Sequence, residues 1–388
     1  MSDNATHTVK ITGYNSDGEG VARLDDGRVA FVRGAAREDV LEVRLTKEQS
    51  RSARAEIIRI LEPSPYRIDP DCSVYSECGG CDYRHITYEE ELFAKLHCVN
   101  DALKRIGGLS VHVEQILNTG QVDSYRNKAT LHSNGSSLGF YRAKSHVVIP
   151  VDHCLLLKDD LNKAIKDLST DNIGSKGEFT LRSGRNGIIQ PLEEELDGLI
   201  FNVEGFFQVN TKAALLLFQK AREYAALTKN DKLVDLYCGV GSFTLFVGRD
   251  AGYAVGVEQN VDAVNVAREN ARHNKLPHVE FIHADAADWM VDTADRMADI
   301  TAPDCVIVDP PRKGLSNDAV RKILELSPKR IVYVSCNPAT LARDLKDLSK
   351  NGYGVENICA VDMFPRTANI ECCCLLVKTG EDDGRDLG

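Results

Sequence analysis

The chain has 388 residues, more than a single hydrophobic core usually serves, so two or three domains are expected. Hydrophobic residues make up 43% and charged residues 27% of the chain, which is typical of soluble globular proteins. No apolar run reaches the about 18 residues of a membrane span, and residues 1–10 are polar, so we expect neither a membrane span nor a secretory signal. We therefore expect a cytoplasmic protein.

The formal net charge of −11 by itself disfavours an RNA partner, because phosphate contacts need Lys and Arg. The charge is unevenly distributed, however. Basic residues recur between Arg23 and Arg67, whereas acidic residues gather at 193–197 and from Glu381 onward. The acidic net charge therefore makes the prediction of an RNA partner weaker but does not exclude it. The 12 cysteines, in a reducing compartment, indicate metal ligation, catalysis or core packing rather than disulfides.

The first 62 residues predict a small β-barrel. Five short segments are apolar or alternate in polarity, with Gly and Asp turn signals between them: 9–11, 21–23, 29–32, 40–43 and 55–58. Five strands in about 55 residues fit a closed barrel of the oligonucleotide-binding type. Such a barrel can bind RNA or only support its neighbours, and the pattern alone does not decide between them.

A Cys-rich segment that begins at Cys72 precedes a helical pattern over about 87–105. Thr87 and Glu90 have the spacing of a capping box at the start of this helix. The pattern is mixed over 111–202, so this part of the chain predicts a central α+β domain.

Strands and helices alternate from about residue 212. Apolar strands are expected at 233–237, 254–257, 279–282, 305–308, 331–334 and 373–377, with a helical stretch at 261–274. This alternation predicts a parallel sheet with helices on both faces, which binds ligands at the carboxyl ends of its strands.

The expected fold class is therefore multidomain α/β. Its domains are a β-barrel at 1–62, a central α+β domain with the Cys-rich segment at 63–204, and a Rossmann-like domain at 205–388. We expect the helix near 87–106 to pack on the last of these.

The first strand of the Rossmann-like series leads into a glycine-bearing turn. Gly239 and Gly241 allow a ligand close to the backbone, and Glu258 ends the next strand, where its carboxylate can accept both ribose hydroxyls. A dinucleotide usually needs a third glycine, where this chain has Thr244. S-adenosylmethionine has no phosphate to seat, so the motif favours this cofactor. Asp285, after the third strand, either faces the adenine amine or caps a helix.

The segment from Asp309 to Gly314, Asp-Pro-Pro-Arg-Lys-Gly, follows the fourth strand. Methyltransferases that act on exocyclic nitrogens often carry an aromatic residue where this chain has Arg312. Arg312 therefore argues against amino methylation. A proline-rich turn capped by Asp309 is the simpler interpretation, and it stays open at this point.

Cys336 ends the fifth strand, where its thiol can face the ligand-binding edge, although a lone Cys in an apolar segment more often fills the core. A thiolate there has a chemical use, because its addition to carbon 6 of uracil makes carbon 5 nucleophilic toward a methyl sulfonium. A base must then remove the carbon 5 proton. Glu371, at the start of the last strand, is the candidate base, and this interpretation depends on Cys336.

A set of five motifs resembles, in order and spacing, the RNA 5-methyluridine methyltransferases: residues 206–210, 235–239, 309–314, 335–338 and 363–371. The likeness extends from about residue 8 to 378. It implies that Cys336 is the nucleophile and Glu371 the proton acceptor. It further implies that the cofactor and uracil site is formed by Gln208, Tyr237, Glu258 and Asp309, with Arg312 as support and Phe206 against the flipped base. One departure is Asn369, where family members often have His.

A second set of cysteines comprises Cys72, Cys78, Cys81 and Cys154. Four thiolates suit an iron–sulfur cluster or zinc. The set resembles the cluster motif of the same family, which implies a [4Fe–4S] cluster with a structural or RNA-positioning role. The N-terminal barrel likewise resembles a TRAM domain, which implies contact with RNA.

The sequence thus predicts S-adenosylmethionine-dependent methylation of uridine carbon 5 in structured RNA by a monomer, with 23S rRNA as the first expectation and tRNA as the second. Two alternatives stay open. A non-catalytic RNA-binding or chaperone-like protein is disfavoured by the pairing of Cys336 with Glu371. A methyltransferase of amino groups or of protein is disfavoured by Arg312.

Overall fold

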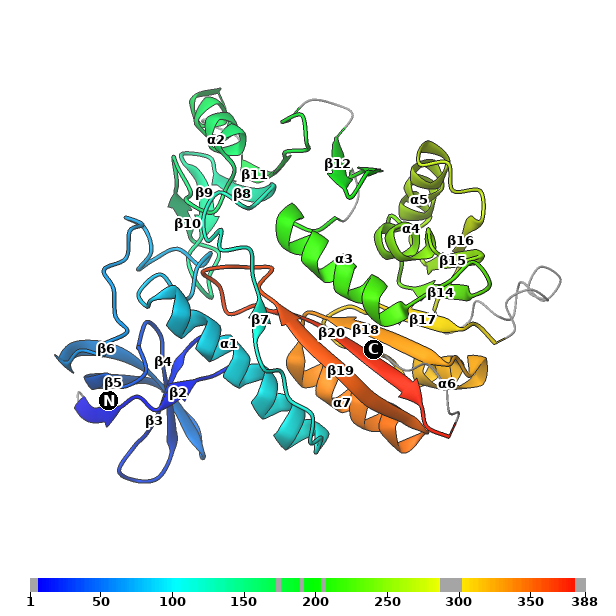
Figure 1. Cartoon of the computed structure of the whole chain (residues 1–388). Coiled ribbons are helices and arrows are strands. Elements are labelled where there is room, and N and C mark those ends of the chain that lie inside the picture. Colours follow the sequence, from blue (N-terminus) through cyan, green and yellow to red (C-terminus); the bar gives the residue numbers. More distant parts are fainter. Residues whose placement is uncertain (1–5, 172–175, 189–191, 204–206, 287–301, 381–388) are drawn as a thin grey trace. The chain divides into compact units, whose positions relative to one another are not determined.

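The computed structural model describes residues 6–171, 176–188, 192–203, 207–286 and 302–380, and the chain folds into two compact units (Figure 1). The first unit comprises Met1–Cys98, Gln121–Leu181 and Phe364–Asn369, and the second comprises Val99–Gly120, Arg182–Met363 and Ile370–Gly388. None of the described helices combines the length and the apolar character that a membrane crossing requires. The three-part division expected from the sequence stays a prediction.

The N-terminal part of the first unit is a six-stranded sheet in the order β1-β5-β6-β4-β3-β2. Its strands are β1 (Thr6–Lys10), β2 (Gly13–Tyr14), β3 (Gly20–Arg23), β4 (Val29–Val32), β5 (Val40–Glu48) and β6 (Ser52–Glu62). Alternate residues such as Val9, Val32 and Leu41 form an apolar core between the strands. The sequence missed β2, because its two residues are too few to form a pattern.

The remainder of the first unit contains most of helix α1 (Tyr88–Ala102) and a four-stranded sheet packed against α2 (Asp159–Asp171). The sheet has the order β10-β9-β8-β11, with β8 (Lys128–Asn134), β9 (Leu138–Tyr141), β10 (Val148–Pro150) and β11 (Lys176–Arg182). Only half of the predicted capping box forms. Thr87 Oγ1 accepts from the Glu90 amide at 3.3 Å, but the Glu90 carboxylate instead accepts from Tyr14 and Arg37.

The short segment Phe364–Asn369 belongs to the first unit although both its neighbours in the chain belong to the second. It is held by buried polar groups of the first unit. The Glu91 carboxylate accepts from the Arg366 amide at 2.7 Å, and the Lys95 ammonium donates to the Phe364 carbonyl at 3.1 Å. The Tyr125 hydroxyl donates to the Pro365 carbonyl at 2.9 Å.

The second unit is built on an eight-stranded sheet in the order β16-β15-β14-β17-β18-β20-β19-β7. Its strands are β7 (Ile116–Leu117), β14 (Lys232–Leu236), β15 (Tyr253–Glu258), β16 (Val279–His283), β17 (Cys305–Val308), β18 (Arg330–Ser335), β19 (Tyr353–Val361) and β20 (Glu371–Lys378). A separate hairpin joins β12 (Glu193–Leu196) to β13 (Leu199–Asn202). The single-turn element η1 (Leu103–Gly107) continues α1.

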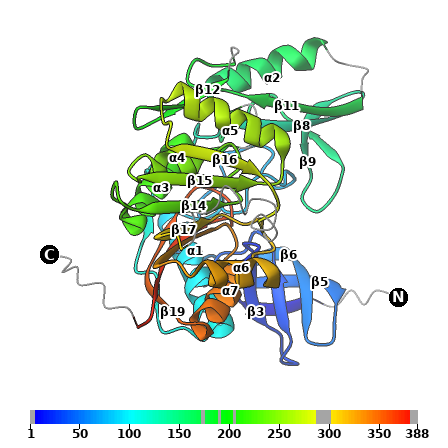
Figure 2. The same ribbon diagram turned by 90° about the vertical axis from the view of Figure 1, so that its right-hand side faces the viewer.

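Helices cover both faces of this sheet, as the alternation predicts (Figures 1 and 2). One face carries α3 (Thr211–Ala225), α4 (Ser242–Gly248) and α5 (Val261–His273), and the other carries α6 (Asn317–Leu326) and α7 (Pro338–Lys350). The strands between them are buried on both sides; every residue of β17 and β18 is buried.

The expectation of a wholly parallel sheet was wrong at its C-terminal edge. Strands β16 to β18 are parallel, but β20 runs antiparallel to both β18 and β19. The sequence missed β19, because polar residues around a register shift between Val355 and Asn357 interrupt its apolar pattern. The reversal has a direct geometric result. The start of β20 pairs with the end of β18, so that Cys372 lies opposite Ser335.

Candidate active site

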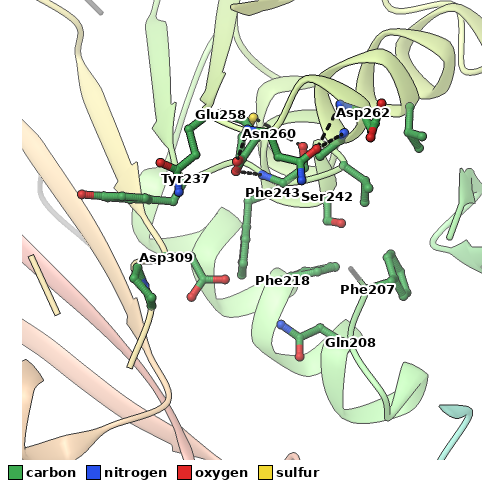
Figure 3. Close-up of a pocket in the computed structure, with 17 residues that line it drawn as sticks. Phe207, Gln208, Phe218, Tyr237, Ser242, Phe243, Glu258, Asn260, Asp262 and Asp309 are labelled. Carbon is green, nitrogen blue, oxygen red and sulfur yellow. Dashed lines mark hydrogen bonds between the residues drawn. The ribbon is translucent and has the colours of Figure 1, made fainter. Parts of the chain in front are cut away.

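A cavity of about 550 Å³ opens at the carboxyl ends of β14, β15 and β17 in the second unit (Figure 3). Five residues that the sequence singled out line it: Gln208, Tyr237, Gly239, Glu258 and Asp309. They come from four separate segments of the chain. The parallel strands bring them together, as the rule for ligand sites in such sheets predicts.

Glu258 has a fixed carboxylate at the wall of this cavity. Its two oxygens accept from the backbone N–H of Gly239 at 3.1 Å and of Asn260 at 2.8 Å. Asn260 in turn caps α5, because its side chain accepts from the amides of Asp262 and Ala263. The glycine turn and the start of α5 therefore orient the acid before any ligand arrives.

The glycine turn itself depends on close packing. Gly241 has φ +83°, and a Cβ at this position would lie 2.6 Å from the Phe281 ring. Gly241 does not line the cavity, so its observed role is to let the turn approach the sheet. Next to it, the Thr244 hydroxyl donates to the Asp235 carboxylate at 2.6 Å, and burial raises the pKa of Asp235 to about 8.

Two further predicted residues, Asp285 and Arg312, are not among the described residues that line the cavity, and a third, Phe206, cannot be placed. Asp285 is exposed, near enough to Tyr237 for its charge to raise the pKa of that phenol, which burial has already increased. Arg312 is exposed, three residues after Asp309. Phe206 falls outside the described residues.

A second group of predicted residues gathers where β17, β18 and β20 meet. Glu371, which is 5% exposed, and Asp309 both lie close enough to Cys336 for their charges to act on its thiol. Burial, with smaller contributions from the two acids, raises the pKa of Cys336 to about 11, whereas Arg312 opposes this shift. Burial also raises the pKa of Glu371 far above its usual range, and Asp309 adds to this effect.

The chemistry available here follows from this set of groups. Burial also raises the pKa of Asp309 to about 7. Asp309 and Glu371 therefore share one poorly hydrated region, with the guanidinium of Arg312 nearby. A thiol, a buried carboxyl group and a cation at the edge of a nucleoside-sized cavity can support nucleophilic addition followed by proton removal.

Sequence reasoning missed several residues of the cavity wall: Phe207, Phe218, Ser242, Asn260 and Asp262. Asn260 could have been found, because Asn two residues after a strand and directly before a helical pattern is a strong N-cap signal. Phe218 carries no such signal, because an apolar residue of α3 has the same pattern whether it faces a core or a cavity.

The second set of cysteines also gathers, within the first unit. Cys78 lies near enough to Cys72, Cys81 and Cys154 for each pair of thiols to interact electrostatically. Burial raises the pKa of Cys81 to about 12, whereas the guanidinium of Arg84 opposes this shift. Within the described residues, no three His, Cys, Asp or Glu side chains are close enough to hold one metal ion. The four thiols therefore lie in one region of the first unit, and the nature of any bound group stays a prediction.

Comparison with known proteins assigns the chain to a family. Residues 196–379 match the family described as tRNA (Uracil-5-)-methyltransferase, and residues 3–58 match the TRAM domain. An uncharacterised RNA methyltransferase of Clostridium tetani is 30% identical over 98% of each chain, and one of Synechocystis is 33% identical over 94% of each. The crystal structure of the Pyrococcus abyssi tRNA (uracil-54, C5)-methyltransferase with S-adenosyl-L-homocysteine is 26% identical, with a TM-score of 0.75 over 96% of this chain and 99% of that one.

These likenesses cover the sheet, the glycine turn and the N-terminal barrel together, and the second unit contains the cavity that a nucleoside cofactor needs. The chain belongs to the RNA (uracil-5-)-methyltransferase family and methylates carbon 5 of uridine in RNA with the methyl group of S-adenosyl-L-methionine.

Proposed function

We propose that Cys336 is the nucleophile and Glu371 the proton acceptor of this methylation. The observation that carries the proposal is the antiparallel pairing of β18 with β20, which brings the end of one strand beside the start of the other. In a parallel arrangement the two residues would lie at opposite edges of the sheet. The electrostatic contact between them and Asp309, a residue of the cavity wall, supports the same assignment.

The reaction then proceeds in three steps. The Cys336 sulfur adds to carbon 6 of the uracil, and the electrons of the 5,6 double bond move onto carbon 5 and oxygen 4. S-adenosylmethionine supplies an electrophilic methyl group, which carbon 5 attacks while the bond from methyl to sulfur breaks. Glu371 then removes the proton from carbon 5, the double bond re-forms, and the Cys336 thiolate leaves.

We further propose that Asp309 and Gln208, both in the cavity wall, contact the cofactor and the uracil, with Arg312 beside them and Phe206 against the flipped base. Asp309 can donate or accept a hydrogen bond near neutral pH, because its pKa is about 7. A uracil edge presents both an N–H and carbonyl oxygens, so this versatility suits it.

The cofactor assignment gives a direct prediction for Glu258. We expect Glu258→Gln to weaken the binding of S-adenosylmethionine by about 1.5–3 kcal/mol, roughly 10- to 100-fold in Kd. The reason is that two charge-assisted hydrogen bonds to the ribose are lost. Isothermal titration with the cofactor alone measures the effect. Glu269→Gln, at an exposed position of α5, the helix that follows Glu258 in the chain, is the matched control. Equal affinities for the two variants would contradict the assignment of the ribose site.

We propose a structured RNA as the substrate, with two candidates. The expectation of 23S rRNA rests on the family resemblance of the barrel and the four cysteines. The full-length likeness to the Pyrococcus abyssi enzyme, whose name specifies uracil 54 of tRNA, favours tRNA as the second candidate. Mapping 5-methyluridine in both RNA classes from cells with and without this gene distinguishes them. We also propose that the enzyme is cytoplasmic and monomeric. Light scattering of the purified protein tests whether it is a monomer.

The N-terminal barrel is proposed as an RNA contact. Several of its basic residues are already neutralised, since Arg44 pairs with Glu56 and Arg59 with Glu42. Lys47 and the neighbouring Arg51 have no ion pair among the described residues. These two cations therefore remain available for phosphate groups.

We propose a [4Fe–4S] cluster at Cys72, Cys78, Cys81 and Cys154. When bound, the cluster would tie together segments that lie far apart in the sequence of the first unit. We expect Cys81→Ser to abolish the visible absorption of the anaerobically purified protein and to lower iron from about four per chain to near zero. Cys98→Ser, also a half-buried thiol, is the control and should keep its iron. Stoichiometric zinc, or no metal in the unmodified protein, would contradict the cluster.

A further inference from the structure

Side chains of helix α7 hold the loop that runs from Asp309 to Leu315. The carbonyl of Arg312 accepts from Asn337 Nδ2 at 2.9 Å, and the Thr340 hydroxyl can donate either to this carbonyl at 3.3 Å or to that of Asn337 at 3.2 Å. Since α7 begins at Pro338, the helix that holds this loop starts two residues after Cys336.

The next turn of α7 holds the end of the same loop. Arg343 Nη2 donates to the Lys313 carbonyl at 3.0 Å, and the buried Asp344 carboxylate accepts from the Leu315 amide at 2.8 Å. Gly314 has φ +76°, and a Cβ there would lie 2.5 Å from both Arg343 Nη2 and Asp344 Oδ2. The loop is thus packed directly onto the helix.

Asn337 is itself fixed from three sides. Its amide N–H donates to Ser335 Oγ at 3.1 Å, and the Ser335 hydroxyl can donate to the Asn337 carbonyl at 3.2 Å. Its side-chain oxygen caps α7 by accepting from the Ala339 amide at 3.1 Å. The Nδ2 group that contacts Arg312 therefore belongs to a residue whose backbone and side-chain oxygen are both already held by hydrogen bonds.

We propose that Asn337 is a positioning residue of the methylation, whose side-chain amide holds the backbone of Arg312 so that the guanidinium stays beside the Cys336 sulfur while the thiolate forms. This inference rests on the proposed role of Cys336. It adds a residue that touches neither the cofactor cavity nor the base Glu371.

The charges around the sulfur explain why such a restraint matters. Glu371 on β20 and Asp309 after β17 both disfavour a thiolate, and Arg312 is the cation that opposes them. The Arg312 side chain is exposed, so the position of its backbone helps to decide where its guanidinium lies. Asn337 and Thr340 fix the backbone from which this side chain extends.

The test uses Asn337→Ser, because Ser keeps the helix cap but has no amide to reach Arg312. We expect the pH profile of Cys336 alkylation by iodoacetamide, followed on the Cys336 peptide by mass spectrometry, to move up by about one pH unit. The rate of adduct formation with a 5-fluorouridine RNA should fall about tenfold at neutral pH. The Kd for S-adenosylmethionine and the unfolding midpoint should stay near the wild-type values.

Thr340→Val removes the weaker donor to the Arg312 carbonyl. It should also raise the pH profile of Cys336 alkylation and slow adduct formation, but by less than Asn337→Ser does. An unchanged alkylation profile and adduct rate in a folded Asn337→Ser variant would overturn the proposal. If Asn337→Ser does not fold, unchanged readouts in Thr340→Val overturn it instead. A wild-type enzyme that forms no adduct at Cys336 would refute the proposed nucleophile, and this outcome is distinguishable from a failure of Asn337 alone.

Discussion

Replacing Cys336 with alanine is expected to abolish the covalent adduct with 5-fluorouridine RNA and to slow methyl transfer by at least about four orders of magnitude. Without addition of sulfur to carbon 6, carbon 5 of uracil stays a poor nucleophile, and the barrier rises by more than about 5 kcal/mol. Single-turnover methylation with a radiolabelled donor measures the rate, and denaturing electrophoresis detects the adduct.

Binding of S-adenosylmethionine should survive in Cys336→Ala, because Cys336 does not line the cofactor cavity. Cys98→Ala removes a half-buried thiol in the other unit and serves as the control for general effects of thiol loss. Methylation by Cys336→Ala at a rate near that of the wild type would show that the nucleophile has been assigned wrongly.

Glu371→Gln is expected to stop the reaction after methyl transfer rather than before it. Gln has nearly the shape of Glu but cannot accept the carbon 5 proton, so elimination of Cys336 should slow by about 100- to 10,000-fold. Addition of the thiolate should not slow, because the variant removes one of the acids that raise the pKa of Cys336. A methylated protein–RNA adduct should therefore accumulate.

The measurement is the amount of radiolabelled methyl group that migrates with protein and RNA together on a denaturing gel. Glu356→Gln, at an exposed position of β19, is the control and should turn over normally. Free 5-methyluridine RNA formed by Glu371→Gln at the wild-type rate would exclude Glu371 as the base. A variant that forms no adduct at all would instead point to a role in binding.

The sequence predicted the strands of the second unit well, because buried strands such as β17 and β18 are continuous apolar runs. It did not predict the direction of β20, because a strand buried on both faces has the same composition in either direction. This difference matters for the site, since the closeness of Glu371 to Cys336 depends on the reversal. The motif spacing proposed the pair from the sequence, but a parallel β20 would have placed its two members at opposite ends of the strands.

Contacts between residues far apart in the sequence explain the other differences between the predictions and the structure. The Glu90 carboxylate leaves the predicted capping box because Tyr14 and Arg37, more than fifty residues earlier, offer better partners. The hold of Asn337 on Arg312 likewise joins residues 25 positions apart. Local propensities carry no information about such pairs, whereas they do predict the caps that Asn260 and Asn337 provide.

The return of Phe364–Asn369 to the first unit has a consequence for how the polypeptide is made. Glu91 and Lys95 form a buried ion pair with each other, and both of them, like the buried Tyr125, also form hydrogen bonds with carbonyl or amide groups of this late segment. Domains usually fold in order as they leave the ribosome, but here the N-terminal unit lacks these partners until almost the whole chain has been translated. Nascent chains released early, and truncations that end before residue 364, should therefore be favoured substrates for chaperones and proteases.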